Sequence, residues 1–273
     1  MAVKQWLRAN REWWDERAAL HAASDFYDLD GFRAGRDDLR PFELDELGVD
    51  PAGLDLVHLQ CHVGTDLLSW ARHGARVVGL DFSAPAVETA RALAADCGLE
   101  AELVVGDVYD AARLLDHRTF DVVYTGIGAL SWLPDIERWA DVVASLLRPG
   151  GMLYLVEIHP FLWSISDGEG PELRWDYFAA LESDSASGSY ADRGAATESN
   201  RVYERNWGFG PVITAVVRSG LVVELVGEHP VGVESYWPFM EQGSDRLWRV
   251  PPEMPQVPLL WSLRARRRQA AYA

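Results

Sequence analysis

The spacing of apolar and polar positions alternates between two periods through the middle of the chain. Short, mostly apolar runs predict strands over residues 54–60, 75–81, 101–105, 120–125 and 152–158. Between these runs, apolar residues recur at helical spacing, which predicts helices near residues 64–73, 84–97 and 134–148. This repeated alternation predicts an α/β fold with a mostly parallel sheet and helices on both of its faces.

The pattern is different before this central region. Residues 3–22 have the spacing of a helix, and the polar, turn-rich residues 24–50 follow, with a short helix expected near 42–47. This segment is too small to form a core of its own. We therefore expect residues 1–50 to be an N-terminal helical cap on one domain that spans residues 51–273.

The alternation is interrupted once more, after the fifth predicted strand. Residues 159–208 are rich in Gly, Ser, Asp and aromatic residues and have no regular period, which predicts an insertion that covers a site. We call residues 159–208 the lid. A helix at 209–219 and strands at 221–226 and 259–263 then complete a seven-stranded sheet.

The most informative stretch begins at the first strand. The apolar run through Leu59 passes into a loop that reaches Gly64, a helix follows, and the second strand ends in Asp81. Strand, loop, helix, strand and acid form the frame of a nucleotide-binding βαβ unit, in which the loop N–H groups and the acid bind the ligand. Ligands bind at the carboxyl ends of such strands, and the polar residues there are Gln60, Asp81, Asp107, Thr125 and Glu157.

Charge argues against one class of partner. The formal net charge is −17, which would repel a phosphate backbone, so we expect no nucleic-acid partner. Four arginines near the C-terminal end, Arg264, Arg266, Arg267 and Arg268, are interpreted as a solubilising tail.

The cysteines and histidines do not predict a metal site. Cys61 and Cys97 lie in no paired pattern, so we expect reduced thiols in a cytoplasmic protein. Strand alternation points His58 away from Cys61, and no second ligand cluster is present in the sequence. We expect no leader segment and no membrane span, because no apolar run is long enough.

Several motifs together resemble those of the class I S-adenosylmethionine-dependent methyltransferases. The first motif of that family, acid-x-Gly-x-Gly-x-Gly, corresponds to His58-Leu59-Gln60-Cys61-His62-Val63-Gly64, in which the acid and two glycines are replaced. A small-molecule subgroup with a Leu-Gln-Cys-His loop is very similar and shares the segment Trp14-Asp15-Glu16-Arg17. The resemblance covers residues 54–158 by motif and implies a Rossmann-like class I methyltransferase fold with S-adenosylmethionine as cofactor.

The resemblance also implies roles for single residues. Asp81 would hold the adenosine ribose, Phe82 would pack on adenine, and Asp107 with Val108 would bind the adenine edge. The cap residues Trp14, Arg17, His21 and Tyr27 would close the site opposite the lid. The predicted cofactor-binding residues are Trp14, Arg17, Gln60, Cys61, His62, Gly64, Asp81, Phe82, Asp107, Val108 and Thr125.

Methyl transfer requires an aligned acceptor, the exclusion of water and, where the acceptor carries a proton, a general base. The predicted catalytic residues are Glu157, His159 and Tyr177, and Tyr124, Asp135 and Tyr203 are further candidates for the base. The many rings predict a small, flat, aromatic acceptor, for which an indole-type natural product fits best. The predicted substrate residues are Tyr27, Trp132, Trp163, Tyr203 and Trp207.

Two other kinds of protein stay open at this point. One is another nucleotide-using enzyme on the same fold, such as an aminopropyl transferase or an oxidoreductase, although the missing three-glycine fingerprint speaks against the oxidoreductase. The other is a non-catalytic cofactor-binding or regulatory protein. In either case the expected partner is a small molecule, with no membrane and no nucleic acid, and the chain would be a monomer or homodimer.

Overall fold

A seven-stranded sheet lies at the centre of the computed structural model, which describes residues 3–165, 168–178, 180–184 and 187–269. Its strands follow the order β3-β2-β1-β4-β5-β11-β8. They are β1 (Asp55–Leu59), β2 (Arg76–Asp81), β3 (Ala101–Val105), β4 (Phe120–Thr125), β5 (Leu147–Ile158), β8 (Leu221–His229) and β11 (Leu260–Arg267). Only the pairs that β11 makes are antiparallel in this sheet, so the predicted mostly parallel, seven-stranded α/β fold is confirmed.

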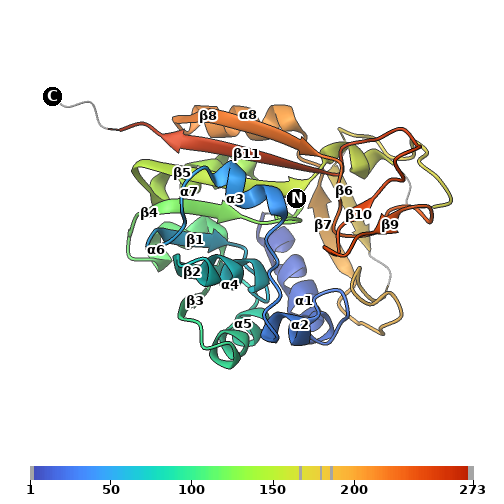
Figure 1. Ribbon diagram of the computed structural model, residues 1–273, viewed down its shortest axis with the longest axis horizontal. Coiled ribbons are helices and arrows are strands. Elements are labelled where there is room, and N and C mark those ends of the chain that lie inside the picture. Colours follow the sequence, from blue (N-terminus) through green and yellow to red (C-terminus); the bar gives the residue numbers. More distant parts are fainter. Residues whose placement is uncertain (1–2, 166–167, 179, 185–186, 270–273) are drawn as a thin grey trace.

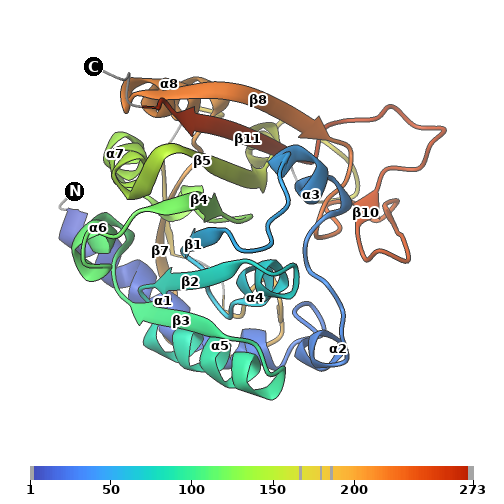
Figure 2. The same cartoon turned by 60° about the vertical axis from the view of Figure 1, so that its left-hand side comes forward.

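Helices cover both faces of the sheet and enclose two apolar cores (Figure 2). Trp139 of α7 and Val216 of α8 belong to the core on one face, and Trp70 of α4 and Val87 of α5 belong to the core on the other. The helices are α1 (Val3–Ala22), α2 (Leu29–Arg33), α3 (Pro41–Leu47), α4 (Thr65–Arg72), α5 (Ala84–Asp96), α6 (Ala111–Leu114), α7 (Ile136–Leu146) and α8 (Phe209–Arg218), with 3-10 turns η1 (Val108–Asp110), η2 (Leu130–Trp132) and η3 (Pro160–Ser164).

Smaller elements gather with α1 at one end of the sheet (Figure 1). The lid contains a hairpin that the irregular sequence did not predict, formed by β6 (Ala180–Asp184) and β7 (Arg201–Arg205). A second hairpin, of β9 (Glu241–Gln242) and β10 (Trp248–Arg249), follows β8. Helix α1 packs against α5 and β7 at the carboxyl ends of the parallel strands, where ligands bind in this class of fold.

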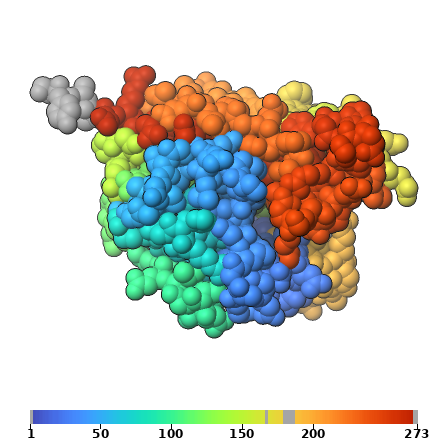
Figure 3. Space-filling model, in the orientation of Figure 1, coloured from blue at the N-terminus to red at the C-terminus, as the bar shows by residue number. Residues whose placement is uncertain are grey.

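The cap is also held from its other side. Arg246 donates from Nη1 to Asp28 Oδ2 at 2.7 Å and from Nη2 to the carbonyl oxygens of Asp25 and Phe26. In the space-filling view the blue N-terminal segment lies directly against the red-orange segment that contains Arg246 (Figure 3). The cap therefore contacts both the lid and the segment after β8.

Three strands extend further than predicted, and β8 is one of them, since it continues from residue 226 to His229. β5 begins at Leu147 instead of residue 152, and β11 continues to Arg267. The prediction that the arginines form a solubilising tail is wrong for three of them, because Arg264, Arg266 and Arg267 lie within β11. Their guanidinium groups donate to Leu47 O, Glu224 Oε1 and Ala144 O, so they fasten the strand to neighbouring elements.

A buried polar network fastens α3 beneath the sheet. Arg40 Nε lies 2.6 Å from Glu43 Oε1, and Arg40 Nη1 donates to Asp66 Oδ1 at 2.8 Å. The Tyr124 hydroxyl donates to Glu43 Oε2 at 2.8 Å, and burial raises the pKa of Glu43 to about 7. One buried cation therefore faces two carboxyl groups.

Within the described ranges, no helix is both long and apolar enough to cross a membrane.

Candidate functional site

The loop after β1 keeps its tight backbone without its usual glycines. Gln60 and His62 have φ values of 61° and 48°, in the left-handed region that favours glycine, and Gly64 follows at 82°. A Cβ on Gly64 would lie 2.9 Å from the Cβ of Ala90, so this position requires glycine for space as well. The His62 N–H points at β2 and donates to Asp81 Oδ2 at 2.9 Å. The loop therefore keeps three left-handed positions, although two of them are occupied by Gln60 and His62 and not by glycine.

Asp81 lies buried where β2 ends. Its two oxygens accept N–H bonds from Ser83 at 2.8 Å and His62 at 2.9 Å. Burial raises the pKa of Asp81 to about 6, although the two N–H bonds lower it. The nearby carboxylate of Asp15 raises it further. Each carboxylate oxygen has a second lone pair, so Asp81 can still accept from ribose hydroxyls.

The adenine-side residues lie beside Asp81. Phe82 is half-buried, and the guanidinium of Arg11 lies 5.8 Å from its ring centroid. Asp107 caps η1 by accepting from the Tyr109 N–H at 2.9 Å, and Val108 is buried in the core. The predicted adenine pair is thus placed at the end of β3, next to the end of β2.

Several buried acceptor atoms at this edge have no donor within the described residues, namely Asp15 Oδ1, Gln60 Oε1, Thr125 Oγ1 and Ser131 Oγ. Thr125 is paired with Leu59 across β1 and β4, so it lies beside Gln60, whose Nε2 is fixed by Ala129 O at 2.9 Å. Buried polar groups are normally paired, and unpaired ones indicate a missing ligand or water. An amino-acid-bearing cofactor such as S-adenosylmethionine fits this set, because its ammonium supplies three donors.

Aromatic side chains from five parts of the chain, including the loop after β1 itself, meet at that loop. We call this group the aromatic cage. Its members are Trp13, Trp14 and His21 from α1, Tyr27, His62, Trp132 from η2 and Tyr190 from the lid. Trp14 is central, with its ring centroid 4.8 Å from that of His62 and 5.1 Å from that of Trp132. The hydroxyls of Tyr27 and Tyr190 lie 2.5 Å apart and join the cap to the lid.

A histidine pair forms the polar part of the cage. His21 Nδ1 and His62 Nε2 are 2.9 Å apart and share one hydrogen bond. Burial lowers the pKa of His21 to about 4, with a contribution from Arg17, and burial also lowers the pKa of His62 well below 6.5. Both rings are therefore neutral near pH 7. Their outer nitrogens, His21 Nε2 and His62 Nδ1, are buried without a partner in the described part of the chain, and a neutral pair makes one of them a donor and the other an acceptor.

Arg17 joins α1 to the lid. Its fully buried guanidinium donates from Nε to Gly188 O at 2.8 Å and from Nη2 to Thr197 Oγ1 at 2.8 Å and Asn200 Oδ1 at 2.9 Å. Nη1 donates to Ser199 O at 3.0 Å and to a carbonyl of its own helix. All five N–H donors are engaged, so this closed arrangement leaves none for the cofactor contact predicted for Arg17.

The predicted catalytic residues hold loops in this structure. Glu157 is buried and accepts N–H bonds from Gly128 at 2.6 Å, Leu130 at 2.9 Å and Ile158 at 2.7 Å. It therefore shapes the loop that carries Trp132. His159 pairs with Glu228 at 3.1 Å and accepts from the Phe161 N–H, so both ring nitrogens are engaged.

The other residues predicted to act on the acceptor are divided between the cage and its surroundings. Tyr27 and Trp132 lie in the cage, whereas Tyr203 accepts from Gln5 Nε2 at 3.0 Å and stacks on Trp6. Trp207 Nε1 donates to Leu133 O at 3.0 Å, between the lid and η2. Three further candidates lie outside the cage contacts given above: Trp163 half-buried in η3, Tyr177 half-buried in the lid, and Asp135 as the cap of α7.

The raised pKa of buried Glu157 leads us to expect that the stability of the protein depends on pH. Burial raises its pKa to about 7 from an ordinary 4.5, although the loop N–H bonds oppose the rise. A raised folded-state pKa contributes stability that is complete below the unfolded pKa and is lost as pH rises through the folded pKa. We expect urea unfolding of the ligand-free protein to show stability falling between about pH 4.5 and 7, and Glu157→Gln to flatten this slope. An unchanged slope in the folded variant would contradict the assignment.

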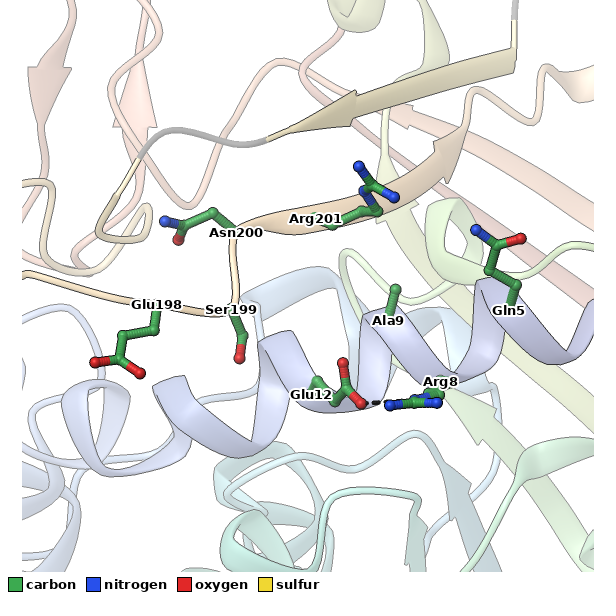
Figure 4. Close-up of a pocket in the computed structure, with 8 residues that line it drawn as sticks. All are labelled: Gln5, Arg8, Ala9, Glu12, Glu198, Ser199, Asn200 and Arg201. Atoms are coloured by element: carbon green, nitrogen blue, oxygen red, sulfur yellow. Dashed lines mark hydrogen bonds and ion pairs between the residues drawn. The ribbon is translucent and has the colours of Figure 1, made fainter.

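A separate cavity of about 550 Å³ lies between α1 and residues 198–201 (Figure 4). Its lining is Gln5, Arg8, Ala9, Glu12, Glu198, Ser199, Asn200 and Arg201. Arg8 and Glu12 pair with each other along the helix at 2.8 Å. None of the predicted site residues lines this cavity, so it lies apart from the cage.

Comparison with known proteins shows which domain the central residues resemble. Residues 57–153 match the methyltransferase domain family. The ubiquinone biosynthesis O-methyltransferase of Xanthomonas axonopodis pv. citri (strain 306) is 33% identical over 143 residues, which are 52% of this chain and 58% of that protein. The corresponding Klebsiella pneumoniae protein is 29% identical over 140 residues, 50% of this chain and 57% of that one. The chain thus aligns with less than two thirds of the length of these relatives.

Solved structures extend the likeness over more of the chain. The structure described as a DhpI-SAH complex covers 97% of this chain and 98% of its own, with a TM-score of 0.60 and 17% identity. An S-adenosylmethionine-dependent methyltransferase from Mesorhizobium loti covers 82% and 95%, with a TM-score of 0.58 and 21% identity. The fold inferred from the sequence is confirmed: it is the fold of the class I methyltransferases, and residues 57–153 match a methyltransferase domain.

Proposed function

We propose that this chain, whose central residues form a class I methyltransferase domain, transfers the methyl group of S-adenosylmethionine to a small, neutral, aromatic acceptor. The observation that carries the proposal is the aromatic cage, which stands directly over the first-motif loop and encloses the His21–His62 pair. Rings surrounding a neutral donor–acceptor pair suit a flat molecule with one polar group. We also propose a cytoplasmic location, since two cysteines outside any paired pattern suit a reducing compartment.

The class of acceptor follows from charge as well as shape. Both histidines are neutral near pH 7, and Arg17, a cation that lies over the cage residue Trp13, is fully engaged in hydrogen bonds. An anionic acceptor would therefore lack a counter-charge there. Neutral rings with an O–H or N–H group, such as phenols and indoles, fit the pair. The relatives named ubiquinone biosynthesis O-methyltransferases add weight to a ring hydroxyl.

The chain's own residues would bind, orient and exclude water. The cofactor supplies an activated methyl group on a sulfonium, and Asp81 with the loop would hold its ribose. Trp14 and Trp132, whose rings contact each other edge to face, would pack against one side of the acceptor, whose polar hydrogen would bond to the outer lone pair of the histidine pair. Since α1 and the lid close over this point, the acceptor would react in a dry environment.

A binding protein without catalysis is the second candidate. It is favoured by the engagement of the residues predicted as bases, because Glu157 and His159 have their polar atoms in hydrogen bonds. Turnover separates the two. We expect incubation with S-adenosylmethionine and a panel of phenols, indoles and amines to give S-adenosylhomocysteine, detected by mass spectrometry, with neutral phenols or indoles. Binding of S-adenosylhomocysteine without turnover on any panel member would favour the binding protein.

His62→Gly tests the role of the cage. Glycine adopts the φ of 48° without strain, so the loop and the affinity for S-adenosylhomocysteine should change by no more than about threefold in calorimetry. Loss of the ring leaves His21 without its partner, and we expect turnover on the best panel acceptor to fall at least about tenfold. Unchanged turnover would show that His62 only shapes the backbone.

A further inference from the structure

We propose that Asp15 on α1 binds the α-ammonium group of the cofactor, in place of the acid that the first motif lacks. The inference rests on the proposed function, since it assigns a residue to the same cofactor site. Asp15 lies in α1, outside residues 57–153, which match the methyltransferase domain. Its carboxylate reaches the cofactor site because α1 packs across the carboxyl ends of the strands.

The residue at the usual acid position cannot supply a negative charge. His58 is buried within β1, with its ring centroid 4.7 Å from that of Tyr124. Burial lowers the pKa of His58 to about 3, with a contribution from Arg40, so the ring is neutral at working pH. A cationic cofactor group therefore requires a counter-charge from another element.

Other acids near the strand ends already have donors. Asp81 accepts two backbone N–H bonds, Glu157 accepts three, and Asp66 pairs with Arg40. Asp107 accepts from the Tyr109 N–H. Among fully buried carboxylate oxygens in the part of the chain that the structure describes, Asp15 Oδ1 stands alone in lacking a donor.

Neighbouring contacts place Asp15 at the cofactor edge. One turn before it, Arg11 lies over the ring of Phe82 at 5.8 Å, beside the ribose acid. The preceding residue, Trp14, contacts His62 and Trp132 at the ends of β1 and β4. Asp15 is also close enough to Asp81 to affect the titration of that carboxyl group. Its carboxylate therefore faces the interval between the ribose acid and the first-motif loop.

The missing partner is a hydrogen-bond donor with positive charge. S-adenosylmethionine has two cationic centres, and only the ammonium carries N–H groups. Three N–H groups require three acceptors, and the other buried, donorless oxygens at this edge in the described residues are Gln60 Oε1, Thr125 Oγ1 and Ser131 Oγ. The sulfonium could not satisfy any of these oxygens by a classical hydrogen bond.

The test compares two ligands on matched variants. S-adenosylhomocysteine carries the ammonium, whereas 5′-methylthioadenosine keeps adenosine and lacks the amino-acid end. We expect Asp15→Asn to weaken S-adenosylhomocysteine about ten- to hundredfold in calorimetry and to leave 5′-methylthioadenosine within about threefold. Asp81→Asn should weaken both ligands, and Glu12→Gln, an exposed charge removal on the same helix, should change neither.

The apoprotein gives an independent measurement. Because Asn removes a buried oxygen charge that lacks a donor, the ligand-free Asp15→Asn variant should melt at the same or a higher temperature, while its stabilisation by S-adenosylhomocysteine shrinks. Equal weakening of both ligands, weakening of S-adenosylmethionine alone, or no weakening would overturn the assignment. If the unmodified protein bound neither adenosine ligand, the proposed function itself would fail, which is a separate outcome.

Discussion

Replacing Arg17 by methionine should lower the free energy of unfolding by about 3 kcal/mol or more and loosen the lid. Methionine keeps the apolar stem against Trp13, over which the guanidinium lies at 4.0 Å, and removes every N–H donor. The carbonyl oxygens of Gly188, which is buried, and Ser199, which is half-buried, would then lose their guanidinium donors. Urea unfolding measures the loss, and hydrogen exchange should rise over residues 187–203.

The matched control is Arg8→Met on the same helix. Arg8 is exposed and pairs with Glu12 along the helix, so its loss should leave the urea midpoint of unfolding nearly unchanged. If Arg17→Met unfolded at the same urea concentration as the unmodified protein and exchange in the lid stayed slow, Arg17 would not be what holds cap and lid together.

Replacing Arg40 by methionine should destabilise the protein by about 3–5 kcal/mol, because two carboxyl groups then share a buried site without a cation. Glu43 is fully buried, Asp66 is partly buried, and both lie within 3 Å of the Arg40 guanidinium. Unfolding in urea near pH 7.5, where Glu43 would otherwise ionise, measures the effect. The loss should shrink towards pH 5, because protonation removes the repulsion.

A double variant separates charge from packing. Adding Glu43→Gln to Arg40→Met removes one of the two carboxylates that lack a cation. The double variant should regain at least about 1 kcal/mol of the free energy of unfolding. Arg33→Met serves as the exposed control, since Arg33 pairs with Asp30 and Asp96 on the surface. No recovery in the double variant would mean that the loss comes from packing of the Arg40 stem.

The regular elements were predictable because their signals are local. The strand ending at Asp81 and the helix after Ser83 follow from apolar spacing and a capping residue, and the structure places α5 at Ala84–Asp96. The lid hairpin was not predicted, because β6 and β7 pair within a segment that lacks a clear two-residue period. The arginines of β11 have the charge pattern of a tail in the sequence, whereas in the structure their side chains reach backbone carbonyls of other elements.

The site was predictable only where a motif carried it. Asp81 could be singled out from its place after a strand, but the meeting of His21 and His62 joins residues 41 apart. The same holds for Arg40 and Tyr124, whose contact depends on how α3 docks beneath the sheet. The spacing of apolar residues indicates which face of a single helix or strand is buried. These contacts depend on how several helices and strands pack together, so the spacing cannot predict them.

The place of β11 in the sheet has a consequence for synthesis of the chain. β11 lies between β5 and β8, although residues 260–267 follow both of these strands in sequence. While the nascent chain emerges from the ribosome, β5 and β8 therefore have no strand between them, and both present unpaired edges. The sheet closes in one late, long-range step, which makes the growing chain vulnerable to aggregation until residues 260–267 have left the exit tunnel.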